Sequence, residues 1–256
     1  MADTASFVRA AATVILFRDR VGAPAELLMM ERAANMAFAA GALVFPGGAV
    51  DDGDHHVAAA LNHELPVDEA AARVAAVRET LEECGIALGF PVDFPSIRLS
   101  TMRTALNGGA AFSELLAAEG VVLDLSALVP FARWRPDSVR APKRRFDARF
   151  YLARAPEGQE ASADMTENMR LLWSSARDTL ADCDAGRGRI IFPTRRNLER
   201  LAALADFSTA VAHAARFPVE RVTPWIEERD GSLHLCIPDH LGYPVTSEPL
   251  ELARRG

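Results

Sequence analysis

Short apolar runs, separated by charged or glycine-containing turns, occupy the first fifty residues. Residues 11–17 (Ala-Ala-Thr-Val-Ile-Leu-Phe) form one run, and residues 26–31 (Glu-Leu-Leu-Met-Met-Glu) form a second after a charged turn at 18–23. Runs of this length and composition are typical of buried strands. Residues 41–48 predict a further short strand that leads into a Pro-Gly-Gly turn. We expect the polar segment 51–65 that follows to be irregular.

The segment from Val67 to Cys84 has a helical pattern, and Gly85 is placed to end the helix as a left-handed cap. On a helical wheel, one face carries only small or apolar residues, and nearly the opposite face carries three glutamates. We expect the first face to pack against the sheet and the acidic face to lie outside the core. The apolar set is Ala70, Val74, Val77, Leu81 and Cys84, and the acidic set is Glu79, Glu82 and Glu83.

The remainder of the chain alternates between the two kinds of pattern. It predicts helices at 110–119, 175–183, 195–205 and 208–215, strands at 129–134, 146–153 and 169–173, and a hairpin within 224–238 around Arg-Asp-Gly at 229–231. The mixture of strands and helices indicates an α/β or α+β fold class.

Composition excludes several classes of protein. The chain has 256 residues, half of them hydrophobic and a quarter charged, as expected of a globular protein with one large domain. The net charge of -7 argues against polymeric nucleic acid as a partner. No apolar run is long enough for a membrane span, no signal peptide is recognisable, and three scattered cysteines fit a reducing compartment, so the cytoplasm is the expected location.

The three glutamates at the end of the predicted helix repel one another. Glu79 stands three and four residues from Glu82 and Glu83, and each like-charge pair at these spacings costs an isolated helix roughly 0.2–0.5 kcal/mol. The helix dipole also disfavours negative charge at this end. Arg78 can offset only part of this charge, whereas a hard divalent cation such as Mg²⁺ or Mn²⁺ takes carboxylate oxygens as ligands. The alternative is a solvated acidic face without a ligand.

The sequence Arg-Glu-Thr-Leu-Glu-Glu-Cys-Gly-Ile at 78–86 resembles the second half of the motif that defines the Nudix hydrolases, RExxEExG followed by an aliphatic residue. Gly48 and Asp54 resemble its first half, with Asp54 in the place of a glutamate. Twenty-three residues separate Asp54 from Arg78, where the common motif has about seven. A long insertion here is a trait of the coenzyme A diphosphatase-like members of the family. Leu-Met-Met-Glu-Arg at 28–32, followed by Phe-Pro-Gly-Gly at 45–48, is similar in spacing to their coenzyme A signature.

This resemblance implies a fold, a domain organisation and a set of site residues. The fold is a mixed β-sheet sandwiched between helices, with helical additions toward the C-terminus. A single Nudix domain spans 1–256, with its core at about 8–175, the insertion at about 55–75 and a helical and hairpin extension at about 176–256. The implied metal ligands are Glu79, Glu82, Glu83 and the backbone of Gly48. The implied catalytic residues are Glu82, Glu83, Arg78 and Glu167, with Glu167 as candidate base and Glu83 as the alternative.

The candidate substrate-binding residues come from the signature-like segment and from the dense basic stretch around residues 140–149. They are Arg32, Phe45, Arg144 and Arg145. Trp134, Phe38 and Tyr151 could stack on a base, although large aromatics at such places are more often core. His55 and His56, beside three aspartates, match no known ligand spacing and are interpreted as part of a solvated insertion loop.

The resemblance therefore implies a metal-dependent hydrolase that cleaves a diphosphate bond in coenzyme A or acyl-CoA. NADH, ADP-ribose or another nucleoside diphosphate conjugate is an alternative within the same class. A non-catalytic Nudix-fold module that binds a nucleotide is an alternative of another class, although such modules commonly lose the acidic residues that this chain retains. The partner in either case is a small nucleotide. The C-terminal helices either cover the core or form a homodimer contact, and the sequence does not choose between the two.

Overall fold

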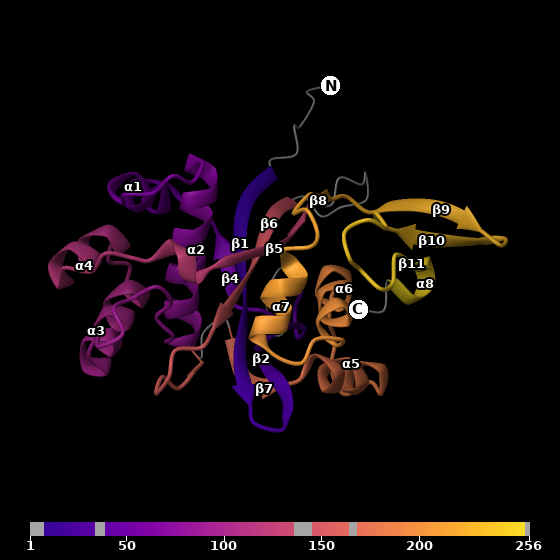
Figure 1. Cartoon of the computed structure of the whole chain (residues 1–256), viewed down its shortest axis with the longest axis horizontal. Coiled ribbons are helices and arrows are strands. Elements are labelled where there is room, and N and C mark those ends of the chain that lie inside the picture. The colour runs from indigo at the N-terminus through magenta and orange to yellow at the C-terminus, as the bar shows by residue number, and fades with distance from the viewer. Residues whose placement is uncertain (1–7, 34–38, 136–144, 164–167, 254–256) are drawn as a thin grey trace.

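A mixed β-sheet lies between two layers of helices in the computed structural model, which describes residues 8–33, 39–135, 145–163 and 168–253 (Figure 1). The predicted fold class and the predicted sandwich are therefore confirmed. The eight strands of the main sheet are β1 (Val8–Arg20), β2 (Ala23–Arg32), β3 (Leu43–Val44), β4 (Gly47–Ala49), β5 (Val129–Trp134), β6 (Arg145–Arg154), β7 (Asn168–Ser174) and β8 (Arg221–Val222).

The long strand β1 organises this sheet. It pairs with β6 in parallel, from Val8 opposite Arg145 to Phe17 opposite Arg154, and with β2 and β4 antiparallel. The order is β3-β2-β1-β6-β5-β8, with β7 beside β2. Both faces of β1 are covered, since Val14 and Leu16 pack on one side and Ile15 on the other, all fully buried. Burial on both faces explains why this strand is a continuous apolar run and does not alternate with polar residues.

One face of the sheet is covered by the helix α2 (Val67–Cys84), which α1 (Asp52–Ala60), α3 (Ser96–Asn107) and α4 (Phe112–Glu119) enclose from outside (Figure 1). A short 3-10 helix, η1 (Leu125–Ala127), follows α4. The side chains of these helices share a hydrophobic cluster with alternate residues of β1 and β2. The predicted helix at 67–84 and its glycine cap are confirmed to the residue.

The opposite face is covered by α5 (Ala176–Asp184), α6 (Phe192–Leu201) and α7 (Phe207–Ala214), as predicted within a few residues at each end. A second, three-stranded sheet follows, formed by β9 (Trp225–Arg229), β10 (Ser232–Cys236) and β11 (Ser247–Pro249), with the short helix α8 (Leu250–Ala253). Its β9–β10 hairpin is the one predicted around residues 229–231. In Figure 1 this small sheet lies at the edge of the molecule, remote from α2.

One expectation about the α2 side was wrong in part, and one helix there was not predicted. Residues 52–60 of the segment expected to be irregular form α1, because Asp51 and Asp54 make a reciprocal capping box that starts this helix. Residues 96–107 form a helix that the sequence pattern did not predict. The acidic face of α2 is also more enclosed than expected, since Glu83 is only 6% exposed. Helices α1 and α3 pack against α2, and the carboxylate of Glu83 accepts a hydrogen bond from the N–H of Gly47 in β4.

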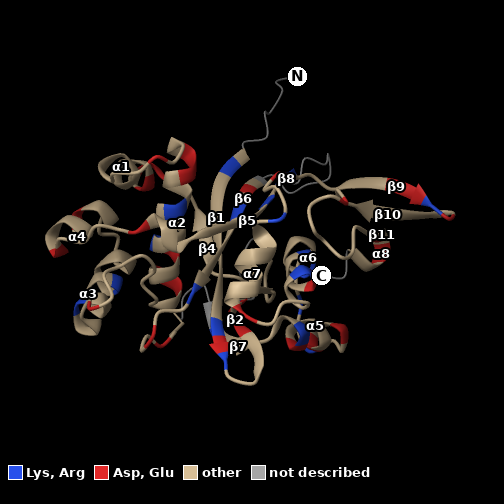
Figure 2. Ribbon diagram, viewed as in Figure 1, with Lys and Arg blue, Asp and Glu red and all other residues tan. Residues whose placement is uncertain are grey.

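Within the described residues, no helix combines the length and the apolar character needed to cross a membrane. Figure 2 shows acidic and basic positions distributed over both helical layers.

Candidate functional site

The C-terminal part of α2 carries the three glutamates in the folded chain. The helix ends at Gly85, which has a φ of 72° and donates its N–H to the carbonyl of Leu81. A left-handed residue at this position favours glycine, because it lacks the Cβ that would be strained there. The last two turns of α2 present Glu79, Glu82 and Glu83 beside the part of the sheet where β4 pairs with β1.

The two glycines of the predicted Pro-Gly-Gly turn are part of the short strand β4, because they pair with β1, and they lie directly against these glutamates. Gly47 has a φ of 149°, and a Cβ on it would stand 2.2 Å from the carbonyl oxygen of Ala12, so only glycine fits. Its N–H donates to Oε2 of Glu83 at 2.8 Å. A Cβ on Gly48 would stand 2.3 Å from the carboxylate carbon of Glu79. The two glycines thus bring the backbone of the turn into contact with two of the three carboxylates.

Arg78 connects the turn, the insertion and the acidic cluster. Its Nε and Nη2 donate to the two carboxylate oxygens of Asp54 at 2.8 and 2.9 Å, and Nη2 also donates to the carbonyl of Ala49 at 3.0 Å. Its Nη1 donates to Glu79 at 2.9 Å and to Glu82 at 3.4 Å. Asp54 is only 1% exposed. The aspartate that stands in the place of the motif's first glutamate therefore holds the arginine of the second half, despite the long insertion.

Burial sets the electrostatics of the cluster. Burial raises the pKa of Glu79 to about 7. The positive charge of Arg78 lowers this pKa, and the negative charge of Glu82 raises it further. Burial also raises the pKa of Glu82. For Arg78 burial alone would lower the pKa, but hydrogen bonds to Asp54 and the nearby carboxylates hold it above its ordinary value. The carboxylates are thus partly dehydrated and repel one another, which is the condition that a bound cation relieves.

The donor chemistry of this cluster fits a hard divalent cation, because carboxylate oxygens on successive turns are the ligands that Mg²⁺ and Mn²⁺ take. Among the described residues, no three His, Cys, Asp or Glu side chains are gathered closely enough to hold a metal ion as they stand. The reason is local, since Glu79 is bonded to Arg78 and Glu83 to the N–H of Gly47. Metal binding would require these carboxylates to turn from their present hydrogen bonds.

The candidate substrate-binding residues Arg32 and Phe45 lie in different environments. Arg32 ends β2, two and four residues after Met30 and Leu28, which pack in the cluster on the α2 side. Its Nε is buried and has no hydrogen-bond partner among the described residues. Phe45, in contrast, is 4% exposed and packs in the cluster on the opposite side of the sheet. Phe45 therefore packs in the core, and its assignment as a substrate contact stays a prediction.

Several other predicted residues lie outside the part of the chain that the structure describes, and others belong to the core or to a helix. Glu167, Arg144 and Phe38 lie outside the described residues, and Arg145 is described only as the first residue of β6. The aromatic side chains of Trp134 and Tyr151 are 2% and 1% exposed and belong to the core. His55 and His56 lie in α1, so the interpretation as a solvated loop is wrong.

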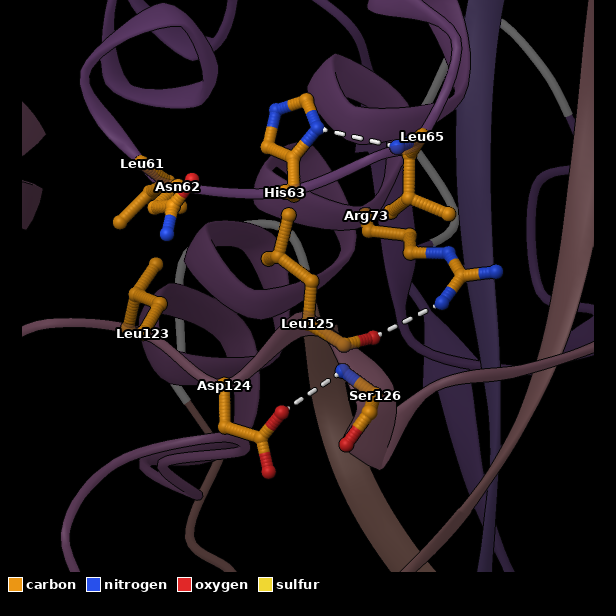
Figure 3. Close-up of a pocket in the computed structure, with 9 residues that line it drawn as sticks. All are labelled: Leu61, Asn62, His63, Leu65, Arg73, Leu123, Asp124, Leu125 and Ser126. Carbon is orange, nitrogen blue, oxygen red and sulfur yellow. Dashed lines mark hydrogen bonds between the residues drawn. The ribbon is translucent and has the colours of Figure 1, made fainter.

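A cavity of about 250 Å³ lies near the opposite end of α2, under the insertion (Figure 3). Leucines from the α1–α2 connection and from the segment around η1 line it, together with Arg73. Arg73 donates to the carbonyl of Leu125 at 2.9 Å and to Glu69 at 3.0 Å. Since Arg73 precedes Glu79 by six residues, or about 9 Å of helix, this cavity is separate from the acidic cluster.

The sequence pattern did not indicate Arg103, which contacts the acidic end of α2. Arg103 of α3 donates hydrogen bonds to the backbone carbonyls of Glu82 and Glu83, both at 3.0 Å. The signal that could have found its helix is the spacing of Leu99, Met102 and Leu106 after Pro95.

A mixed sheet between helices, together with a helix whose glutamates meet the two glycines of a short strand, is the arrangement of a Nudix hydrolase. Comparison with known proteins bears this out. The family model of the NUDT19 Nudix domain matches residues 55–201, which is more than half of the chain, so the chain belongs to this family. It is a hydrolase of the Nudix class.

Two known proteins illustrate the relationship. The human acyl-coenzyme A diphosphatase NUDT19 is 27% identical over 285 residues, which cover 89% of this chain and 76% of the human protein. The crystal structure of a Nudix hydrolase from Alicyclobacillus acidocaldarius is 30% identical and superimposes with a TM-score of 0.71, covering 82% of this chain and 97% of that one. Nudix hydrolases generally use divalent metals and act on small nucleotide substrates.

Proposed function

We propose that this chain is a divalent-metal-dependent diphosphatase that cleaves coenzyme A or acyl-CoA. The observation that carries the proposal is the partly dehydrated cluster of Glu79, Glu82 and Glu83 against the backbone of Gly47 and Gly48. The similarity to a human acyl-coenzyme A diphosphatase over most of the chain supports the choice of substrate. The long insertion within the motif, which here forms most of α1, its connection to α2 and the first turns of α2, supports the same choice.

Glu79, Glu82 and Glu83 would hold Mg²⁺ or Mn²⁺, with the backbone carbonyl of Gly48 as a further ligand. When bound, such a metal lowers the pKa of its water and neutralises charge on the phosphate oxygens. Arg78 holds the carboxylates of Glu79 and Glu82 from one side and Asp54 from the other, so it orients the cluster.

The remaining tasks are proton transfer and substrate binding. In hydrolysis, the oxygen of water forms a bond to one phosphorus while the bond from that phosphorus to the bridging oxygen breaks. A carboxylate must accept the proton of the water, and Glu167 is the candidate, with Glu83 as the alternative. Arg32 has a buried nitrogen without a partner among the described residues and would bind a phosphate oxygen, with Arg144 and Arg145 as further candidates. Coenzyme A would yield 3′,5′-ADP and phosphopantetheine.

A product-resolved assay tests this function. Purified protein is incubated with coenzyme A, an acyl-CoA, NADH, ADP-ribose and a dinucleoside polyphosphate, each with Mg²⁺, with Mn²⁺ and with chelator. The proposal predicts that 3′,5′-ADP appears from the coenzyme A substrates only with metal. Preferential formation of AMP from NADH or ADP-ribose would identify one of these as the substrate, and the protein would still be a diphosphatase. Nucleotide binding without turnover of any substrate would contradict the proposal and favour a non-catalytic module.

We also propose that residues 1–256 act as one Nudix domain that includes the C-terminal extension. Support comes from buried contacts between the extension and the sheet. The indole Nε1 of Trp134 in β5 donates to the hydroxyl of Tyr243 at 3.0 Å, and that hydroxyl donates to Asn197 of α6 at 3.2 Å. The strand β8 also extends the sheet beside β5.

A further inference from the structure

The C-terminal turn of α2 concentrates negative charge, and no residue within this turn is basic. The last carbonyls of any helix have no partner within the helix and carry partial negative charge. The last turn of α2 contains Glu82 and Glu83 but no basic residue. Two carboxylates and the exposed carbonyl ends thus concentrate negative charge at the same place, and this charge would loosen the turn on which the proposed metal ligands stand.

Arg103 supplies the missing cation from α3. Its Nε donates to the carbonyl of Glu82 and its Nη2 to the carbonyl of Glu83, both at 3.0 Å. The guanidinium also packs on the helix cap, since a Cβ on Gly85 would stand 2.9 Å from its Nη1. These bonds run to the main chain of the two glutamates, so the arginine can fix their backbone without using their carboxylate oxygens.

The same guanidinium holds the connection between β6 and β7. Its Nη1 donates to the hydroxyl of Ser162 at 2.6 Å and its Nη2 to the Ser162 carbonyl at 2.7 Å. The N–H of Ser162 in turn donates to the carbonyl of Cys84 at 2.9 Å. Arg103 and Ser162 together therefore satisfy the carbonyls of Glu82, Glu83 and Cys84, which follow one another at the end of α2.

We propose that Arg103 is a positioning residue that fixes the C-terminal turn of α2, and with it Glu82 and Glu83, in the geometry that binds the divalent metal. This inference rests on the proposed function. Arg103 acts through the backbone of the ligands and touches neither metal nor substrate. A planar guanidinium with several fixed donors suits this task, because it binds two carbonyls and a serine at once, which a lysine ammonium on a flexible stem does less well.

The test compares Arg103→Met and Arg103→Lys with the wild-type chain and with Arg98→Met. Arg98 is the matched control, because it is an arginine on the same helix that contacts Glu119 and not α2. The full-length, metal-free protein is titrated with Mn²⁺, and free Mn²⁺ is followed by electron paramagnetic resonance. Thermal unfolding establishes that each variant is folded, and kcat and KM are then measured with the substrate that the product-resolved assay identifies.

We expect Arg103→Met to weaken Mn²⁺ binding by about 10–100-fold, the usual effect of losing an outer-shell partner of a metal ligand. The loss in activity should fall mainly on kcat, because the substrate is not contacted. Arg103→Lys should recover part of the affinity, and Arg98→Met should match the wild type.

An affinity of Arg103→Met within about twofold of the wild type would overturn the inference, as would an equal loss in Arg98→Met. Should Arg103→Met not fold, the lysine variant decides, and a wild-type Mn²⁺ affinity in Arg103→Lys overturns the inference. A wild-type chain that binds no Mn²⁺ would instead contradict the proposed function, so the two failures are distinguishable.

Discussion

At the scale of single residues, Arg78 has the greatest influence on the acidic end of α2. Its guanidinium binds both oxygens of Asp54, and Asp54 is almost fully buried. Removal of one partner from a buried ion pair leaves the other partner charged and dehydrated, which costs far more than loss of an exposed pair.

We therefore expect Arg78→Met to lower the free energy of unfolding by about 3–5 kcal/mol, because Asp54 would lose its counter-ion. Urea denaturation followed by circular dichroism measures this change. Arg18→Met is the control, since Arg18 is half exposed and pairs with Glu26 at the surface, and it should cost at most about 1 kcal/mol. Losses of similar size in the two variants would contradict the larger contribution to the free energy of unfolding that is expected of the Arg78–Asp54 pair.

Part of this site could be predicted from the sequence. Periodicity and repulsion identify Glu79, Glu82 and Glu83 as candidate metal ligands, and the family resemblance implies that the Pro-Gly-Gly segment lies beside them. The depth of burial of Glu83 and Asp54 could not be predicted, because it depends on contacts between segments far apart in the sequence. Asp54 of α1 pairs with Arg78 of α2, and the carboxylate of Glu83 accepts a hydrogen bond from Gly47 of β4. The packing of Phe45 in the cluster opposite α2 could not be predicted either, because spacing along the chain does not reveal which face of the sheet a side chain occupies.

At the scale of elements, local signals decided which predictions succeeded. The helix at 67–84 was predicted to the residue because a long periodic segment ends at a glycine that adopts the left-handed conformation. The apolar pattern does not indicate α1, because the signal for this helix is the capping box of Asp51 and Asp54 within a polar segment. Helix α3 has no side-chain hydrogen bond at its N-cap and buries only three residues, so its periodicity is weak.

The contact between α6 and α7 should be sensitive to pH. Nε of Arg200 donates to Nε2 of His213 at 3.0 Å, a bond that requires a neutral imidazole. Burial, together with the charges of Arg200 and Arg216, lowers the pKa of His213 below 6.5. The unfolded chain therefore takes up this proton at a higher pH than the folded chain does. The stability of the contact should be complete above pH 6.5 and fall as the pH drops below it.

Urea midpoints at pH 7.5 and 5.5, for the wild type and for His213→Gln, test this expectation. Glutamine can accept the same hydrogen bond without titrating, so the variant should lose less stability than the wild type between the two pH values. His240→Gln, at an exposed position, is the control and should follow the wild type. Identical pH profiles for the wild type and His213→Gln would contradict the account.

At the scale of the whole molecule, the C-terminal extension is joined to the sheet by buried polar contacts. The hydroxyl of Tyr243 accepts a hydrogen bond from Trp134 and donates one to Asn197, and Tyr243 and Trp134 also meet edge to face with ring centroids 5.6 Å apart. The extension was expected from helical and hairpin patterns, but its attachment to the sheet was not, because such long-range contacts leave no periodic signal.

Tyr243→Phe should destabilise the chain by about 1–3 kcal/mol, because the indole N–H of Trp134 loses its buried acceptor. Tyr151→Phe is the matched control, since the hydroxyl of Tyr151 is buried without a hydrogen-bond partner among the described residues. It should cost little. Chemical denaturation of both variants gives the comparison, and an equal loss in the two would indicate that the extension is held by apolar contacts alone.

Metal-dependent turnover of Glu82→Gln tests the acidic cluster as the metal site, with Glu114→Gln as an exposed acidic control on α4. We expect Glu82→Gln to fold normally but to lose turnover by at least about 100-fold, which is more than the loss of an outer-shell partner costs. Its Mn²⁺ affinity should fall as well, while Glu114→Gln stays at the wild-type level. Full turnover in Glu82→Gln, with unchanged dependence on Mg²⁺ or Mn²⁺, would contradict the assignment of the acidic cluster as the metal site.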